Sequence, residues 1–213
     1  SGHRWTLKRP LRVAGAEGQE FGVCSEQGIL KDAEESQQFS LSFLLALEFC
    51  SERANVRLSV FASKKKAPKQ ATWDLTIQNC QLTLTVPGGG APLTATIKKN
   101  EWVHVTLLTE DLSFDPVGRN SSKFFEFKSH LIVQGMSAAQ SVVGKSKRER
   151  REDGKTTGSL NWSASRICLS NQFPDHADFA QVYVLSRQLS ASELKTIRQK
   201  SVADRTEPRP GML

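Results

Sequence analysis

The feature that most constrains this chain is a two-residue alternation of apolar side chains between residues 39 and 186. It is clearest over residues 39–49, where every second residue is Phe or Leu. The alternation recurs in four further segments, residues 56–60, 73–77, 82–86 and 93–97. Because successive side chains of a β-strand face opposite sides, each segment is predicted to be a strand with one buried face.

Further strands are predicted over the rest of this region. Residues 102–108 are apolar on both faces, which is typical of a strand covered on both sides. Short apolar runs at residues 124–127, 131–133, 167–169 and 182–185 complete the set, and residues 21–24 are a candidate edge strand. About ten short strands without intervening helices predict an antiparallel sandwich or barrel.

One helix is predicted, near the C-terminus. Ser190-Ala-Ser-Glu193 matches the capping box, in which the serine hydroxyl and the glutamate carboxylate each accept a hydrogen bond from the other residue's amide. Leu189 and Leu194 flank the cap at the positions of a hydrophobic staple. We expect a single domain over residues 1–202, followed by a flexible tail over 203–213.

The four cysteines are predicted to be reduced and buried. They are widely separated, contain no C-x-x-C pair and have no nearby histidine, so neither a metal site nor a cofactor is expected. This favours an intracellular setting but leaves the compartment open. The sequons Asn120-Ser-Ser and Asn161-Trp-Ser give only weak support for secretion, because chance alone provides about one.

The net charge of +7 is concentrated in two basic segments, residues 64–69 and 145–155. We expect these segments to contact an acidic partner. The second is predicted to lie in a disordered loop insertion over residues 136–158. Solvation, contact with a protein or nucleic acid, and nuclear import all remain open as uses of this charge. The candidate partner-binding residues are Lys64, Lys65, Lys66, Lys69, Lys145, Lys147, Arg148, Arg150 and Arg151.

No catalytic residue is predicted. A glycoside hydrolase of this kind of fold needs two carboxylates on one strand, and no E-x-D-x-E pattern is present. The formal phosphate-loop pattern at residues 139–146 lacks a following helix and is interpreted as accidental. His104 alternates with apolar residues. It is expected to be a strand residue whose ring is hydrogen-bonded, and not a metal ligand or a catalytic base. No apolar run approaches the length of a membrane-spanning helix, so membrane insertion is not expected.

Tryptophan is the residue type most suited to a sugar platform. Trp73 and Trp102 fall within the strand alternation and are predicted to be core residues. Trp162, which follows the predicted loop, is the candidate glycan platform.

Four stretches resemble the concanavalin A-like superfamily, and within it the laminin-G-like jelly rolls. Residues 39–43 resemble an early strand of the type F-T-I-S-F/W, residues 100–105 resemble the W-H-H-V-A strand, and residues 130–135 resemble the L-Y-V-D/N-G strand and turn. Residues 179–194 are similar to the closing motif F-x-G-x-I-D-x-V-R-I-Y-N-R-A-L-S-x-x-E-I. The resemblance implies an antiparallel two-sheet jelly-roll sandwich over about residues 39–200.

The chain departs from the family at two positions. Ala180-Gln181 lacks the acidic residue of the closing motif, and Gln134 replaces the Asp or Asn before Gly135. A calcium-dependent lectin site is therefore not expected, because calcium usually requires several carboxylate oxygens.

The main functional hypothesis is a non-catalytic module for protein–protein interaction within a larger protein or assembly. Carbohydrate binding, which the resemblance implies for many relatives, is the first alternative. Binding of nucleic acid or another polyanion through the basic segments is the second alternative.

Overall fold

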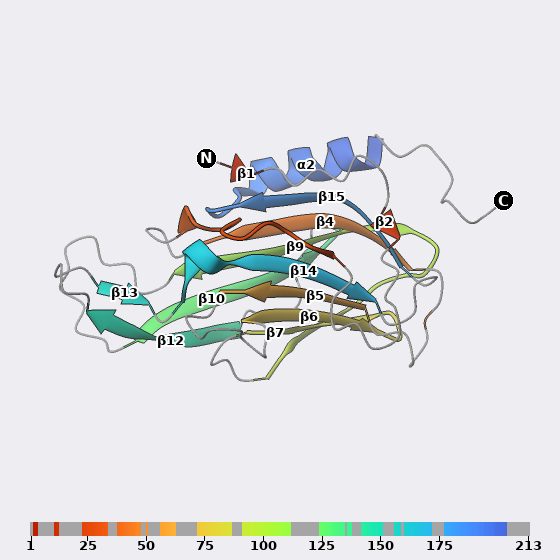
Figure 1. Ribbon diagram of the computed structural model, residues 1–213. Helices are drawn as coiled ribbons and strands as arrows, with labels where there is room; N and C mark the ends of the chain where they lie inside the picture. The colour runs from red at the N-terminus through yellow and green to blue at the C-terminus, as the bar shows by residue number, and fades with distance from the viewer. Residues whose placement is uncertain are drawn as a thin grey trace.

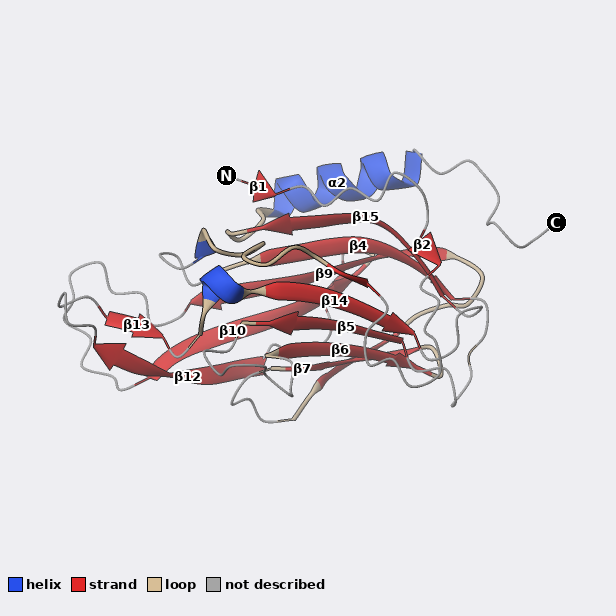
Figure 2. Cartoon of the chain, viewed as in Figure 1, coloured by secondary structure: helices blue, strands red, loops and turns tan. Residues whose placement is uncertain are grey.

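A computed structural model gives the fold of this chain. It describes residues 2–3, 11–12, 23–33, 38–47, 50, 56–62, 72–86, 91–111, 124–134, 136–137, 142–150, 156–158, 160–171 and 177–203. The described strands form two sheets, and helix α2 (Ala191–Ala203) lies alongside β15 at one side of the molecule (Figures 1 and 2). The prediction of an all-β sandwich with a short C-terminal helix is confirmed.

The larger sheet has nine strands, and all of its described pairings are antiparallel. Its main path is β1 (Gly2–His3), β15 (Ala177–Leu185), β4 (Ser40–Leu47), β9 (Trp102–Asp111), β10 (Phe124–Val133), β12 (Val142–Arg150) and β13 (Thr156–Gly158). Two short strands join from the side, β2 (Leu11–Arg12) beside β15 and β11 (Met136–Ser137) beside β10.

The smaller sheet has six strands. Their order is β3 (Val23–Cys24), β14 (Arg166–Asn171), β5 (Val56–Phe61), β6 (Trp73–Gln78), β7 (Gln81–Thr85) and β8 (Leu93–Thr96). Figure 1 shows β14, β5, β6 and β7 running side by side in front of the larger sheet. The predicted edge strand near residue 23 is therefore present as β3.

The core lies between the sheets and follows the predicted alternation. Leu41, Phe43 and Leu45 of β4 belong to the main hydrophobic cluster, together with the alternate residues of β5, β6 and β9. At one end of the sandwich the ring of Trp73 stacks on that of Trp162 with 5.8 Å between centroids. Phe39 meets the ring of Trp73 edge-on. Burial of these large rings stabilises the packing of the two sheets.

The predicted disordered loop over residues 136–158 is wrong for most of its length. Residues 136–137, 142–150 and 156–158 are strands, and β12 pairs with β10 from Phe124 opposite Lys147 to Ser129 opposite Val142. Cross-strand hydrogen bonds are made by the backbone, so a polar segment can extend a sheet that is already nucleated by apolar neighbours. Residues 142–150 therefore form a strand in spite of their polar composition.

The prediction of reduced cysteines is also wrong. Cys24 is bonded to Cys168 and Cys50 to Cys80, and no cysteine is free. Cys24 lies directly opposite Cys168 in the pairing of β3 with β14. The two cysteines are 144 residues apart in the sequence, so their proximity could not be predicted from spacing. It arises from the register in which β3 pairs with β14.

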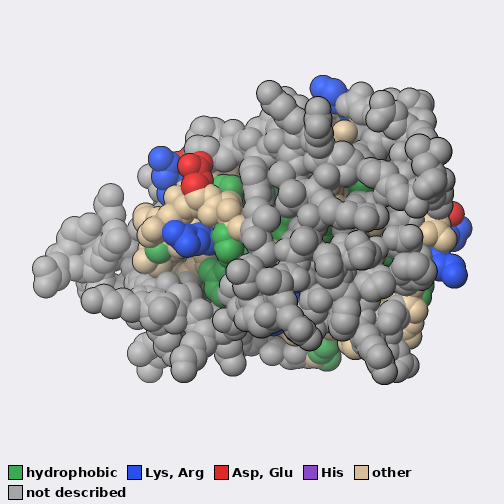
Figure 3. Space-filling model, turned by 45° about the vertical axis from the view of Figure 1, so that its right-hand side comes forward, with side chains coloured by type: hydrophobic (Ala, Val, Ile, Leu, Met, Phe, Trp, Pro, Cys, Tyr) green, Lys and Arg blue, Asp and Glu red, His purple; other side chains and the backbone are tan. Residues whose placement is uncertain are grey.

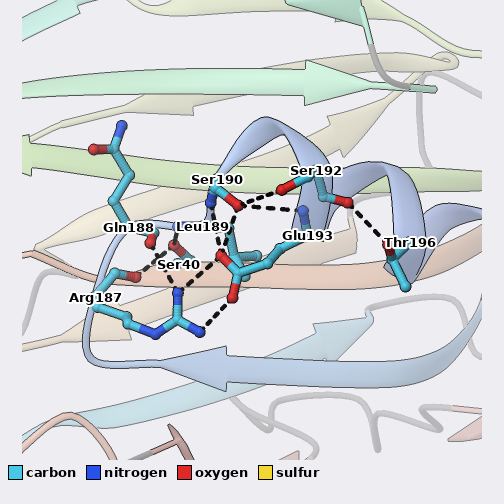
Figure 4. A network of polar contacts seen from close by, with 8 residues as sticks. All are labelled: Ser40, Arg187, Gln188, Leu189, Ser190, Ser192, Glu193 and Thr196. Carbon is cyan, nitrogen blue, oxygen red and sulfur yellow. Dashed lines mark hydrogen bonds and ion pairs between the residues drawn. The ribbon is translucent and has the colours of Figure 1, made fainter.

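Helix α2 begins at the predicted capping box. The Glu193 carboxylate accepts a hydrogen bond from the Ser190 amide at 2.9 Å, and the Ser190 hydroxyl accepts one from the Glu193 amide at 3.3 Å. Arg187 adds a two-pronged ion pair to the same carboxylate (Figure 4). These bonds lower the pKa of Glu193 to about 2, with the Arg187 guanidinium as the largest cause. No helix in the described part of the chain is both long enough and apolar enough to cross a bilayer.

The cap predicts the effect of a single substitution. Ser190→Ala removes the side-chain acceptor for the Glu193 amide and should lower the free energy of unfolding by about 1 kcal/mol. Lys195→Ala, an exposed site on the same helix, serves as the matched control and should change it by less than about 0.5 kcal/mol. Urea titration of the three proteins measures the difference, and equal losses in both variants would show that the cap does not hold α2.

Candidate functional site

The outward face of the larger sheet is partly covered by α2. Ser40 and Leu44 of β4 point away from the hydrophobic cluster between the sheets, yet both are buried. The Ser40 hydroxyl accepts a hydrogen bond from the Leu189 amide at 2.9 Å and donates one to the Arg187 carbonyl at 2.7 Å (Figure 4). Further along the helix, Arg198 donates to the Gln134 carbonyl at 2.5 Å. The segment that carries α2 is therefore attached to this face at two points.

A buried row of polar side chains lies on the same outward face. The Ser42 hydroxyl lies 2.8 Å from Nε2 of His104 and accepts a hydrogen bond from the Thr106 hydroxyl at 3.2 Å. Burial, and secondarily the positive charge of Arg198, lowers the pKa of His104 from 6.5 to about 4. The prediction that His104 is a satisfied strand residue is confirmed. Ser42 is 0% and His104 3% exposed, so this serine–histidine pair has no contact with solvent through which a substrate would reach it.

The lowered pKa of His104 predicts a pH dependence. The unfolded chain binds a proton at about pH 6.5 and the native state only near pH 4, so the free energy of unfolding falls as the pH drops through this interval. The full loss is about 3 kcal/mol. His104→Gln, whose amide can still reach Ser42, should flatten this part of the curve. Denaturant titrations at several pH values measure it, and an unchanged slope in the variant would remove His104 as the cause.

Trp102 is a half-buried aromatic residue on this outward face. It begins β9, and the alternation of the strand places it on the opposite face from buried Val103. The Gln134 side chain brackets the start of the strand, donating to the Trp102 carbonyl at 3.3 Å and accepting from the His104 amide at 3.5 Å. Gln134 itself has a positive φ of 52°, and its amide bonds to the His104 carbonyl at 2.8 Å.

Charged and amide residues precede Trp102 in the chain or are linked to the backbone at the start of β9. The connection before β9 holds four exposed residues, Lys98, Lys99, Asn100 and Glu101. Half-buried Arg198 arrives from α2 through its bond to Gln134. We call this group the Trp102 corner, defined as Lys98, Lys99, Asn100, Glu101, Trp102, Gln134 and Arg198. It unites segments separated by up to 100 residues and combines an aromatic ring with hydrogen-bonding and positively charged groups.

The predicted basic residues lie partly outside the described residues and partly on β12. Lys64, Lys65, Lys66, Lys69 and Arg151 lie outside the described residues. Lys145, Lys147, Arg148 and Arg150 belong to strand β12. Glu126 stands directly opposite Lys145 in the register. On the face of the molecule drawn in Figure 3, the described Lys and Arg side chains lie at separate places. Because β12 is a strand, the phosphate-loop pattern does not lead into a helix.

Trp162 is a core residue, contrary to its prediction as a glycan platform. It is 1% exposed and lies in the 3-10 turn η1 (Trp162–Ala164), stacked on Trp73. The turn directs its ring into the sandwich, although the preceding sequence is polar. Sequence reasoning placed Trp102 in the core instead. The outward position of Trp102 could have been predicted, because adjacent strand residues face opposite sides and Val103 was predicted to be buried.

The described residues show no metal-binding group. Among them, no set of three His, Cys, Asp or Glu side chains lies close enough to hold an ion. A histidine and a carboxylate make contact across β9 and β10, where His130 lies 3.7 Å from Glu110.

Comparison with known proteins gives structural neighbours only. No family model and no curated protein sequence matches the chain. The binding domain of botulinum neurotoxin DC, in complex with rat synaptotagmin II, aligns at 12% identity and a TM-score of 0.51. The ligand-binding domain of botulinum neurotoxin serotype D, in complex with N-acetylneuraminic acid, aligns at 13% and 0.50. Trypanosoma rangeli sialidase in complex with sialic acid aligns at 15% and 0.50.

These neighbours share a β-sandwich with this chain. The alignments cover 84%, 78% and 80% of this chain, but only 39%, 37% and 24% of the respective neighbours. At such low identity the likeness shows the fold alone.

The two tryptophans give a direct test of which one is structural. Trp162→Ala should lower the free energy of unfolding by about 3–5 kcal/mol, because it opens a cavity beside Trp73 and Phe39. Trp102→Ala should cost less than about 2 kcal/mol, since this side chain is only partly buried. Equal losses in chemical denaturation would place both rings in the core and exclude the Trp102 corner as a site.

Proposed function

We propose that this chain is a non-catalytic, laminin-G-like carbohydrate-binding module whose site is the Trp102 corner. The observation that carries the proposal is a half-buried tryptophan at the start of β9, on the outward sheet face, whose carbonyl accepts from the Gln134 side-chain amide. The Arg198 guanidinium in turn donates to the Gln134 carbonyl. Sugar rings offer C–H groups that pack on aromatic side chains and hydroxyls that need fixed donors and acceptors. The corner offers both kinds of contact.

Rigidity of the surrounding groups also favours a binding site at the corner. Gln134 is held through its backbone and side chain to β9, and Arg198 is held to Gln134. A binding group that is fixed before the ligand arrives loses less conformational entropy on binding. The corner therefore suits recognition of a small, polar ligand better than a mobile loop would.

The absence of catalysis is part of the proposal. Glycoside hydrolysis generally uses two carboxylates on opposite sides of the scissile bond. At the Trp102 corner the one carboxylate is that of Glu101, and the buried Ser42–His104 pair lies beneath the surface. The charges of Lys98, Lys99 and Arg198 instead favour a ligand with a negative group.

The structural neighbours agree with this choice in general terms. Two of them hold sialic acid, named as N-acetylneuraminic acid in one case. The four sequence stretches that resemble laminin-G-like domains support membership of that family within the shared sandwich fold. Neither observation locates a ligand on this chain, so the Trp102 corner rests on its own geometry.

A protein partner is the second candidate. A third neighbour is in complex with rat synaptotagmin II, and a module of this type can serve protein–protein interaction within a larger assembly. The basic residues of segments 64–69 and 145–151 would then contact an acidic protein surface or nucleic acid. Such contacts would weaken steeply with added salt, because they depend on charge.

The proposal is tested by glycan binding. The full chain should bind members of a panel of neutral and sialylated oligosaccharides, measured by array and then by calorimetry. Trp102→Ala should weaken that binding about tenfold or more, equal to about 1.4 kcal/mol, through loss of the ring contact. Trp102→Phe should retain part of the affinity, since it keeps an aromatic face.

Thr94→Ala is the matched control, because Thr94 is exposed on β8 of the other sheet. It should bind as the unaltered chain does. Absence of binding to every glycan would contradict the carbohydrate proposal. Binding that survives Trp102→Ala unchanged would place the site elsewhere on the molecule.

A further inference from the structure

We propose that Asn161 is an N-linked glycosylation site, and that the chain therefore folds in an oxidising secretory compartment. This modification is independent of the glycan-binding site, because it concerns a sugar attached to the chain and not one recognised by it. Three observations carry the proposal: the sequon, the geometry of its side chains, and the two disulfides.

The sequon Asn161-Trp162-Ser163 is presented in a form that permits attachment. Asn161 is half-buried, Trp162 points into the core, and Ser163 is exposed. The Asn161 side-chain oxygen Oδ1 caps the η1 turn by accepting a hydrogen bond from the Ala164 amide at 3.2 Å. The amide nitrogen Nδ2, which would carry the sugar, has no hydrogen-bond partner among the described residues. A glycan on Nδ2 therefore leaves the cap intact.

The two disulfides supply an independent reason to expect this modification. Cys24–Cys168 links β3 to β14, and Cys50–Cys80 links two further segments. Disulfides of this structural kind form in the endoplasmic reticulum lumen and other oxidising compartments. Attachment of N-linked glycans to Asn-X-Ser/Thr belongs to secreted and surface proteins of the same route.

The position of Asn161 is compatible with the proposed binding site. The Asn161 amide bonds to the Ala62 carbonyl at 2.6 Å, and Trp162 contacts Phe39, the residue just before β4. Trp102 pairs with Ala46 near the other end of β4. The glycan and the Trp102 corner thus lie at opposite ends of the sandwich, and a sugar on Asn161 leaves the corner open.

The covalent step is a glycosyl transfer from a lipid-linked oligosaccharide pyrophosphate. A bond forms between Asn161 Nδ2 and the anomeric carbon, and the bond from that carbon to the pyrophosphate oxygen breaks. The lipid pyrophosphate leaves with the bonding electron pair, and a base of the transferase takes the amide proton. No oxidant or reductant is needed.

Glycopeptide mass spectrometry of the protein isolated from its natural source tests the proposal. The peptide that contains Asn161 should carry a hexosamine-based glycan. Peptide N-glycosidase treatment in heavy-oxygen water should convert Asn161 to a labelled Asp. An unmodified Asn161 in that material would overturn the proposal.

Variants secreted from a eukaryotic host separate the sequon from other causes. Asn120→Gln removes the other sequon, and in this background Ser163→Ala should abolish the glycan-dependent gel shift. Ser163→Thr is the matched control and should retain the shift. Persistence of the shift in Ser163→Ala would contradict attachment at Asn161.

Glycan binding by the Ser163→Ala protein distinguishes this proposal from the one above. Unchanged binding with the gel shift lost is the expected result. Loss of glycan binding in Ser163→Ala would contradict the separation of the two sites. If Trp102→Ala leaves glycan binding unchanged, only the Trp102 corner is contradicted, and the modification of Asn161 still stands.

Discussion

The attachment of α2 to the outward face of the larger sheet is the contact on which the proposed site depends. At its start, the helix is fixed by the reciprocal bonds of Ser190 and Glu193 and by the two-way contact of Ser40 with the preceding turn. Further along, Arg198 bonds to Gln134, which in turn bonds to Trp102. The helix that begins at this cap is thereby connected, through Arg198 in its interior, to the Trp102 corner.

The same outward face also holds a buried row of polar side chains. Ser42, His104 and Thr106 are buried on the outward face of β4 and β9, and buried polar groups without partners are strongly destabilising. The three side chains satisfy one another by hydrogen bonds, and His104 stays neutral at physiological pH. The row is thus a structural feature of the sheet, although a serine beside a histidine resembles a catalytic pair.

Much of the fold could be predicted from the sequence, because it depends on local rules. Two-residue alternation located the core strands, and the capping box located α2. The errors came from features that exist only after strands pair. The disulfide of Cys24 with Cys168 depends on the register of β3 against β14, and β12 is ordered by pairing with β10 in spite of its polar composition.

The candidate site was less predictable than the fold. Trp102, Gln134 and Arg198 are far apart in sequence, and no motif joins them. Trp162 follows a polar stretch and looked accessible, but the η1 turn directs it into the core. Strand alternation specifies which face a residue occupies. It does not specify which outward positions α2 covers and which it leaves half open.

The most direct test of the account is an NMR titration of the full chain with a sialylated oligosaccharide. Each tryptophan indole N–H gives its own signal, and the chain has four tryptophans. We predict that the signal of Trp102 shifts on addition of sugar, along with the amides of Gln134 and residues 98–101. The signals of Trp73 and Trp162 should stay in place. Shifts confined to β12, or to the outward face of the six-stranded sheet, would contradict the Trp102 corner as the binding site.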